Sequence, residues 1–194
     1  DDAGSPPPNG GPAKKPAKAE PQQKELKEKY EKTCQMYTTM QHCAAKLNLP
    51  QMTVATAITF FHKFFSKYSL RQYKAEHVAA TCLFLAGKTE STNRKMKEII
   101  SVSFRISEGH ENYQKYRDIL VDIEMQLIRV LEFDFNVVHP YRFFIKKMDE
   151  VRGAKEWKQL GWQLINDSYN TSVCTKRQPE EIAHAIIHVA AACL

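Results

Sequence analysis

The sequence predicts an all-α fold, and three observations support this prediction. Apolar residues recur at every third or fourth position in one segment after another, which is the spacing of a buried helix face. No segment shows the sustained alternation of apolar and polar residues that marks a half-buried strand. A weak internal repeat, with an offset of 104 residues, pairs two apolar helical segments of the first half with two of the second.

The N-terminal segment differs from the rest in composition. Residues 1–23 hold six of the nine prolines and three of the seven glycines, and they include no leucine, isoleucine, valine or aromatic residue. Such a segment cannot bury enough apolar surface to offset the entropy that ordering costs. The sequence therefore predicts a disordered tail over residues 1–23.

Two helices are predicted after the tail. The first has an apolar stripe on one face, and glutamate–lysine pairs at four-residue spacing support its exposed face. The second begins at Pro50, since proline suits the first turn of a helix, and carries Val54, Ile58, Phe61 and Phe65 on one stripe. The stripe of the first helix comprises Leu26, Tyr30, Cys34, Tyr37, Met40, Ala44 and Leu47.

The segment Ala75–Lys88 is predicted to be a central helix. Its only formal charges are Glu76 near its start and Lys88 at its end, and the residues between them are apolar nearly all round. A helix of this kind is surrounded by other helices. Apolar spacing then predicts a fourth helix over residues 96–104 and a longer fifth helix that includes residues 119–131.

The second half of the chain repeats part of this pattern. At the offset of 104 residues, residues 57–65 fall on residues 161–169, and residues 78–86 fall on residues 182–190. The second half begins at His139-Pro140, where the proline again suits a first helical turn. The sequence ends inside the third helix predicted for this half.

The tripeptide Gly87-Lys88-Thr89 suggests a phosphate-binding loop, which requires GxxxxGK[ST] between a buried strand and a helix. Here Cys82 stands where the first glycine is required, and a predicted helix precedes Gly87. Nucleotide binding is therefore not expected. Lys88 is interpreted instead as a cation at the carboxyl end of a helix, where its charge complements the helix dipole.

Other catalytic and metal-binding patterns are also missing from the sequence. His184 and His188 are four residues apart on one helix, but the glutamate of the HExxH pattern and a third ligand are not evident. We interpret both histidines as helix-packing residues. No catalytic constellation is found, so neither a metal nor another cofactor is expected, and the chain is not predicted to be an enzyme.

Composition limits the class of protein further. The five cysteines form no CxxC pair and lie in apolar helical patterns, which predicts reduced core thiols in an intracellular protein. The longest uncharged apolar run has 13 residues, fewer than the roughly 20 that span a bilayer. The net charge of +6 is spread along the chain, which favours a solvated basic surface over nucleic-acid binding.

Several motifs in the same order resemble the cyclin box. They are the helix ATAITFFHKFF, the stretch LFLAGKTE and the segment VDIEMQLIRVLEFDFNVVHPYRFFIKKM. The resemblance covers roughly Glu25 to Leu194, and HPY, NDSYNT and PEEIAHAIIHVAAA are most similar to the transcriptional cyclins of the K, T and L group, K in particular. It implies one complete five-helix cyclin box repeat over residues 24–137 and part of a second repeat over residues 138–194.

The resemblance also implies a function and the residues that carry it. Cyclins bind and activate a cyclin-dependent protein kinase, and the family's kinase-gripping lysine and glutamate match Lys88 and Glu124. Phe133 and Phe135 match the family's apolar contacts to the kinase's regulatory helix. Glu90 is the first acid of the family's Lys-x-Glu-Glu pattern, and the second acid is replaced by a serine in this chain.

By analogy, the kinase would act in the nucleus on the repetitive C-terminal domain of the large RNA polymerase II subunit. Two alternatives to kinase activation remain. Cyclin-like repeats also occur in transcription factor IIB, which binds promoter DNA and protein, but basic and acidic residues are interspersed here and do not form a basic stripe. The other alternative is a scaffold that binds a kinase without activating it.

Overall fold

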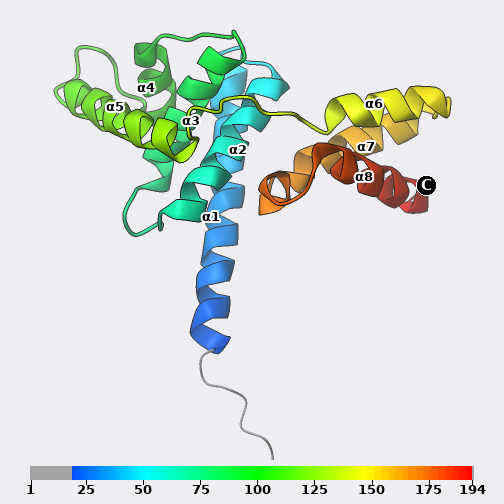
Figure 1. The fold of residues 1–194 in the computed structure, drawn as a ribbon. Helices are drawn as coiled ribbons and strands as arrows, with labels where there is room; N and C mark the ends of the chain where they lie inside the picture. Colours follow the sequence, from blue (N-terminus) through cyan, green and yellow to red (C-terminus); the bar gives the residue numbers. More distant parts are fainter. Residues whose placement is uncertain (1–18, 194) are drawn as a thin grey trace, which may run out of the picture.

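The computed structural model describes residues 19–193, and this part of the chain contains helices and no strand. Helices α1–α5 form one group, and α6–α8 form a second group beside it (Figure 1). The all-α prediction is confirmed. In chain order the helices are α1 Ala19–Lys46, α2 Gln51–Lys67, α3 Ala75–Thr89, α4 Met96–Phe104, α5 Tyr113–Val130, α6 Tyr141–Glu150, α7 Lys155–Ser168, the short 3-10 helix η1 Ser172–Thr175 and α8 Pro179–Cys193.

Helix α1 starts earlier than predicted. It begins at Ala19, so residues 19–23 are helical and do not belong to a disordered tail. Alanine, glutamate, glutamine and lysine are strong helix formers, and Pro21 lies in the first turn, where backbone N–H groups have no helical partner to lose. The rest of the predicted tail, residues 1–18, lies outside the described residues.

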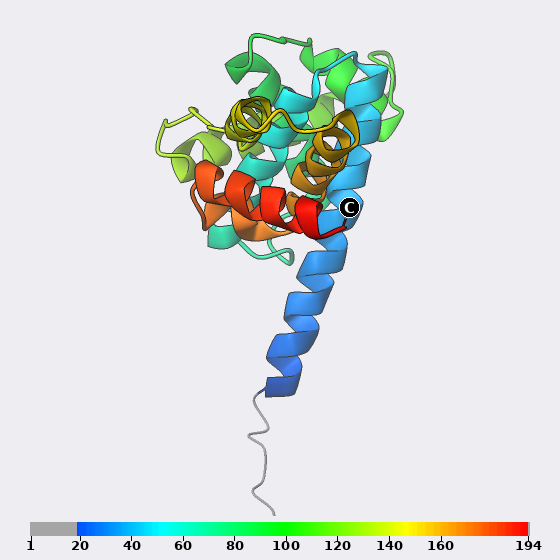
Figure 2. The ribbon, with the colours of Figure 1, turned by 90° about the vertical axis from the view of Figure 1, so that its right-hand side faces the viewer.

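The apolar stripe of α1 is buried only toward the C-terminal end of the helix. Tyr37 and Met40 are 3% and 0% exposed, whereas Leu26 and Tyr30 are 70% and 51% exposed. Figure 2 shows the start of α1 extending beyond both groups of helices, in agreement with the exposure of these two side chains. The prediction that the apolar stripe forms a buried face over the whole helix is therefore wrong at Leu26 and Tyr30.

Helix α3 is the centre of the first group, as predicted. It packs against α1, α2, α4 and α5. Most of its side chains are buried, including Val78, Cys82 and Leu83. Burial on all sides explains why a 15-residue segment needs so few charges.

Helix α2 is more deeply buried than its predicted single stripe implied. Thr53, Thr56 and Thr59 are buried together with the apolar face, because α2 packs against α1, α3 and α5 and also against η1. Each threonine hydroxyl has a hydrogen-bond partner, as buried polar groups require. Helix α2 thus connects the two groups of helices.

The boundaries of the helices preserve the internal repeat. Helices α2 and α7 begin at positions 51 and 155, and α3 and α8 begin at positions 75 and 179, an offset of 104 in both cases. Helices α1 and α6 end at positions 46 and 150, which is the same offset. The repeat found in the sequence is therefore a repeat of helices in space.

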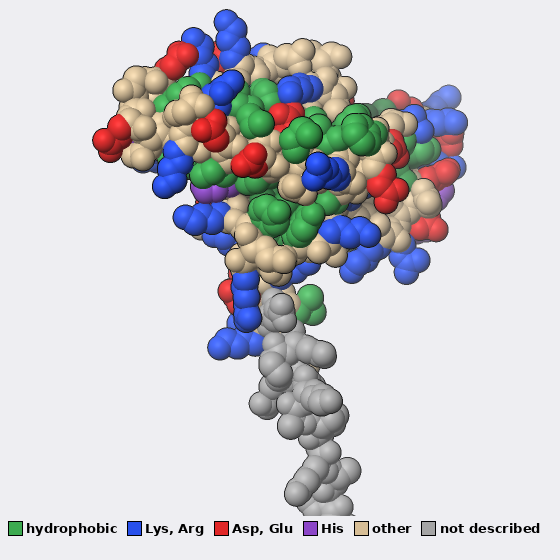
Figure 3. Space-filling model, turned by 60° about the vertical axis from the view of Figure 1, so that its left-hand side comes forward, with side chains coloured by type: hydrophobic (Ala, Val, Ile, Leu, Met, Phe, Trp, Pro, Cys, Tyr) green, Lys and Arg blue, Asp and Glu red, His purple; other side chains and the backbone are tan. Residues whose placement is uncertain are grey.

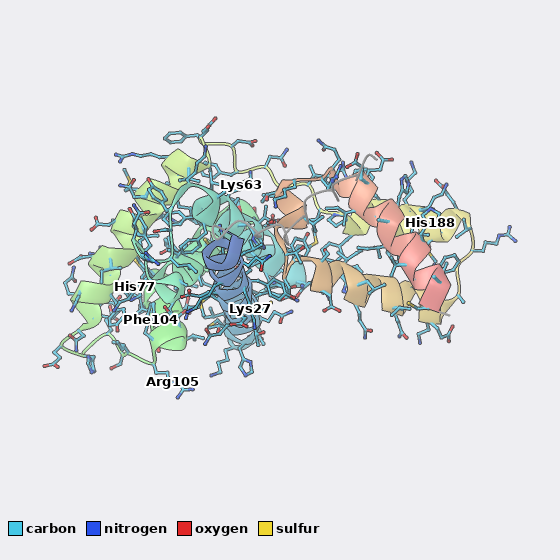
Figure 4. All side chains as sticks on the ribbon, turned by 90° about the horizontal axis from the view of Figure 1, so that it is seen from below. Lys27, Lys63, His77, Phe104, Arg105 and His188 are labelled. Carbon is cyan, nitrogen blue, oxygen red and sulfur yellow. The ribbon has the colours of Figure 1, made fainter. Side chains whose placement is uncertain are left out.

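The second group consists of α6, α7 and α8, which pack on one another. Gly161 of α7 lies against the ring of the buried Phe144 of α6. Seen from below, this group lies to one side of α1, with His188 on α8 (Figure 4). His184 and His188 are both exposed, so the helix-packing role predicted for them is wrong in this structure.

The cysteines only partly follow the sequence prediction. Cys43 and Cys82 are buried, Cys34 and Cys174 are half-buried and Cys193 is exposed, and all five are free thiols. The predicted core position is correct for the first two only. Within residues 19–193, no helix combines the length and the apolar character that crossing a membrane requires.

Candidate partner-binding site

The last turn of α3 presents Lys88 at the surface. The helix continues through Thr89, and Ser91 takes the left-handed conformation with φ of 55°. The N–H of Thr92 donates to the carbonyl oxygen of Gly87 at 2.8 Å, which closes the helix as a Schellman-type cap does. A Cβ atom on Gly87 would meet the Thr92 oxygen at 3.3 Å, so glycine lets the chain turn back closely here. A phosphate loop is excluded because a helix, not a strand, precedes Gly87.

Lys88 pairs with Glu124 of α5. Its Nζ atom lies 2.7 Å from Oε1 of Glu124 and 4.1 Å from the ring centre of Phe84. The Lys88 side chain is 47% exposed and that of Glu124 is 14% exposed. The cation therefore remains accessible while a carboxylate and an aromatic face fix its position.

Helix α5 places Glu124 at the margin of its buried face. Leu120, Ile123 and Leu127 pack into the core, and α5 packs against α3. The opposite side of the helix carries the exposed side chains Val121 and Met125. Glu124 thus lies between the core and a partly apolar outer surface.

The chain after α5 holds Phe133 outward. The N–H groups of Glu132 and Phe133 donate to the carbonyl oxygens of Arg129 and Ile128, which is the Schellman pattern. Both Glu132 and Phe133 have positive φ, 54° and 62°. Phe133 is 72% exposed, the largest value among the large apolar residues of the described chain. A bulky residue in this conformation costs about 1–2 kcal/mol, so the backbone is strained where a large apolar side chain faces solvent.

The remaining predicted residues lie beside these. The rings of Phe133 and Phe135 are 6.5 Å apart and nearly perpendicular. Lys88, Glu90 and Phe135 line one open pocket of about 650 Å³. The structure therefore brings the five predicted site residues together on one side of α3 and α5, with Glu124 in the middle of α5 and the others at or just after the ends of the two helices. Figure 3 turns the α5 side of the molecule forward and shows apolar side chains gathered there with basic and acidic side chains among them.

Glu90 is held by a buried polar network. Its Oε1 atom accepts a hydrogen bond from Thr56 at 2.6 Å, and the Thr56 hydroxyl lies 2.8 Å from Nε2 of His139. Nδ1 of His139 lies 2.7 Å from the hydroxyl of Tyr169. Burial lowers the pKa of His139 to about 4 against the opposing effect of Glu90, and burial also raises the pKa of Tyr169. Both rings therefore stay neutral at physiological pH.

Sequence reasoning missed several parts of this surface. Phe84 is one of many apolar residues in its helix, so nothing in the sequence singles it out. Its contact with Lys88 could have been inferred only from the four-residue spacing of the two residues. Thr56 and His139 are 83 residues apart, so no local pattern connects them. Met125 and Val121 are exposed at four-residue spacing on α5, which a helical projection of the sequence could have shown.

The groups on this surface are of the kinds that can bind another protein. The surface offers one exposed cation, carboxylate acceptors and exposed aromatic rings, which together suit backbone polar groups and apolar side chains of another protein. Within residues 19–193, no cluster of three or more histidine, cysteine, aspartate or glutamate side chains is arranged to hold a metal.

Comparison with known proteins establishes the family. Residues 13–136 match the family described as Cyclin, N-terminal domain, and this match covers more than half of the 194 residues. The chain belongs to the cyclin family. The resemblance found in the sequence is thus confirmed, and the matched residues include all five predicted site residues of this cyclin.

The relatives of this cyclin include members of the K and T groups. Cyclin-T1-4 of Arabidopsis thaliana is 34% identical over 166 residues, covering 79% of this chain and 31% of that protein. Cyclin pch1 of Schizosaccharomyces pombe is 36% identical over 157 residues, covering 75% and 45%. Human Cyclin-K is 34% identical over 153 residues, covering 75% and 26%. The chain therefore spans less than half of the length of these relatives, and identity does not separate the K group from the T group.

Solved structures with the same fold come from multiprotein complexes. One is a chain of the yeast RNA Pol II CTD kinase CTDK-1 complex, with a TM-score of 0.79 and 20% identity over 86% of this cyclin and 56% of that chain. Another is a chain of the yeast TFIIK (Kin28/Ccl1/Tfb3) complex, with a TM-score of 0.71 and 23% identity over 86% and 72%. At these identities the similarity concerns the fold.

Proposed function

We propose that this cyclin binds and activates a cyclin-dependent protein kinase of the transcriptional class through Lys88, Glu124, Phe133 and Phe135. One observation carries the proposal: the strained, 72% exposed Phe133 lies on the same surface as the fixed ion pair. Large apolar residues held outward at a backbone cost are typical of binding sites. The names of the relatives and the kinase complexes among the solved structures support the same assignment.

In this proposal, the first cyclin box repeat, residues 24–137, provides the surface, and residues 138–194 belong to the second repeat. Lys88 and Glu124 would exchange part of their mutual hydrogen bonding for backbone groups of the kinase. Phe133 and Phe135 would pack against the regulatory helix of the kinase. Glu90 lines the pocket between these two contacts and would add an acceptor.

Such a grip is sufficient for activation without any catalytic group in the cyclin. Phosphoryl transfer requires a lysine of the kinase to pair with a glutamate on its regulatory helix, which must lie inward. A partner that binds only the inward state shifts the population toward it, by no more than its preference for that state. The cyclin would therefore act as a regulatory subunit in a heterodimer.

The substrate and the cellular location follow from the proposed class of kinase. Kinases of this class would phosphorylate the repetitive C-terminal domain of the large RNA polymerase II subunit, and the complex would act in the nucleus. The similar CTDK-1 complex is itself named an RNA Pol II CTD kinase, which supports this choice of substrate.

Reconstitution with a panel of cyclin-dependent kinases tests this function. Each kinase would be assayed alone and with the cyclin, on a heptad-repeat peptide of the polymerase tail. The proposal predicts that at least one transcriptional kinase gains activity with the cyclin and loses the gain with Phe133→Ala. Binding without a gain in activity would instead identify a scaffold, and a salt-sensitive shift of promoter DNA would favour the transcription factor IIB alternative.

A further inference from the structure

A line of hydrogen bonds crosses the boundary between the two groups of helices. It begins at Tyr169, which follows α7, passes through His139 in the segment between α5 and α6, and reaches Thr56 in the middle of α2. It ends at Glu90, just after α3. Thr56, His139 and Tyr169 are 0%, 4% and 1% exposed, so solvent has little access to the three inner members.

The Glu90 carboxylate at one end of this line determines which atom donates in each of its hydrogen bonds. An ionised carboxylate can only accept, so Thr56 donates its one hydroxyl proton to Glu90. The Thr56 oxygen must then accept from His139, which requires the proton of the neutral imidazole to be on Nε2. Nδ1 is left bare and accepts from the hydroxyl of Tyr169. The tautomer of His139 is therefore assigned from the hydrogen-bond network.

The behaviour of Thr56 differs from that of most threonines in these helices. Five of them, Thr33, Thr38, Thr39, Thr59 and Thr81, donate to the carbonyl oxygen four residues earlier in their own helix. Thr56 instead donates across to another element. A hydrogen bond within the helix would have satisfied the buried hydroxyl of Thr56 equally well, but the hydroxyl orients Glu90 instead.

We propose that Thr56, His139 and Tyr169 position the Glu90 carboxylate for a partner protein, so that packing of the second group of helices sets the geometry of the first group's binding surface. Oε1 of Glu90 is held by Thr56, and the carboxylate lines the pocket that Lys88 and Phe135 share. For Oε2 of Glu90 no hydrogen bond occurs within the described residues, so a partner donor can reach a carboxylate that is already oriented. The part of this inference that concerns a partner protein rests on the proposed kinase binding.

The tautomer can be tested without any partner. Nitrogen NMR of the wild-type chain at pH 7 should show a protonated Nε2 and an unprotonated Nδ1 at His139. A protonated Nδ1 would overturn the proposal, because the line would then run in the opposite direction and Thr56 could not donate to Glu90. This result does not depend on kinase binding, so it separates failure of the chain from failure of the proposed function.

The positioning role is tested by isosteric replacement within α2. Thr56→Val removes the hydroxyl and keeps the shape, and Thr56→Ser restores the hydroxyl. Thr59→Val is the matched control, since Thr59 is also buried but its hydroxyl donates to the carbonyl oxygen of Ala55 and takes no part in the line to Glu90. We expect Thr56→Val to bind the kinase about tenfold more weakly than wild type, as the loss of one hydrogen bond to a charged group implies. Thr56→Ser and Thr59→Val should bind within about threefold of wild type.

Equal affinities for Thr56→Val and Thr59→Val would overturn the positioning role even with the predicted tautomer. Circular dichroism would establish that each variant is folded. Should Thr56→Val not fold, Tyr169→Phe asks the same question from the other end of the line, because it removes only the hydroxyl that donates to His139. Wild-type affinity in Tyr169→Phe would then count against the proposal, and a loss of affinity would support it.

Discussion

The Nζ atom of Lys88 lies 2.7 Å from Oε1 of Glu124, which joins the last turn of α3 to the middle of α5. The two residues are 36 positions apart in the sequence. Their side chains remain 47% and 14% exposed. Such a pair contributes little to folding, because water and salt screen it, whereas a partner that covers it would remove that screening.

Replacing the ion pair should therefore have little effect on the stability of the free chain. We expect Lys88→Ala and Glu124→Ala each to lower the free energy of unfolding by about 0.5 kcal/mol, the range of exposed pairs. Urea denaturation followed by circular dichroism measures this. A loss of several kcal/mol would show that the pair holds α3 and α5 together, and its role would then be structural.

Phe133 should be more important for binding than for stability. Phe133→Gly removes the cost of about 1–2 kcal/mol that a bulky residue has in the left-handed conformation. The greater flexibility of glycine in the unfolded chain offsets about 0.5–1 kcal/mol of this gain. The free chain should keep its stability or gain up to about 1 kcal/mol. Kinase affinity should fall about tenfold or more, as for an aromatic residue at the centre of an interface.

Glu132→Gly is the control for this change. Glu132 also has a positive φ, 54°, and its side chain is exposed. The same relief of backbone strain should occur, but Phe133 stays in place, so affinity for the kinase should be kept. If Glu132→Gly and Phe133→Gly weaken binding equally, the backbone conformation, and not the aromatic ring, is what the partner requires.

His139 makes stability depend on pH. Its folded pKa of about 4 lies below its ordinary value of 6.5, so the unfolded chain binds a proton more readily between these values. The free energy of unfolding should therefore decrease as the pH falls from 6.5 to 4, by roughly 3 kcal/mol from this residue, and this contribution is complete above pH 6.5.

Denaturation at a series of pH values, with His139→Gln for comparison, measures this contribution. The pKa values of His62 and His77 are also lowered, mainly by burial. The free energy of unfolding of His139→Gln should therefore still decrease as the pH falls, but less steeply than that of wild type. Parallel curves for the two proteins would mean that His139 can charge without breaking its hydrogen bonds to Thr56 and Tyr169.

Gly161 should be intolerant of a side chain. A Cβ atom there would overlap the ring of Phe144, which is 1% exposed, so the ring or its helix would have to shift. We expect Gly161→Ala to lower the free energy of unfolding by about 1–3 kcal/mol, the usual cost of overpacking. Gly109→Ala is the control, since a Cβ atom there meets nothing within 4 Å. Equal stability of the two variants would show that α6 and α7 can move apart at no cost.

The order and type of the helices could be predicted from local spacing. The central α3 was identified because burial on all sides excludes charges from its middle, and this is visible in one continuous segment. The start of α1 and the exposure of Leu26 and Tyr30 could not be predicted, since they depend on where neighbouring helices end. The buried threonines of α2 were missed for the same reason, because elements distant in the sequence, η1 among them, pack against α2.

The candidate site, too, could be predicted only in part. Lys88 is recognisable as a cation at the end of an apolar helix, and the cyclin resemblance pointed to Glu124, Phe133 and Phe135. That the four lie on one surface is a fact of tertiary packing between α3 and α5. The positive φ of Phe133 has no sequence signal, since no glycine or asparagine marks the turn.

The central claim is tested most directly by the affinity between this cyclin and its kinase, measured by calorimetry for wild type and for Lys88→Ala/Glu124→Ala. The matched control is Lys32→Ala/Glu76→Ala, which removes an ion pair of 2.6 Å at the other end of α3. We predict a loss of at least about 30-fold for the first variant, which corresponds to the lower end of 2–5 kcal/mol for a covered polar contact, and wild-type affinity for the control. Undiminished affinity in Lys88→Ala/Glu124→Ala would contradict the account.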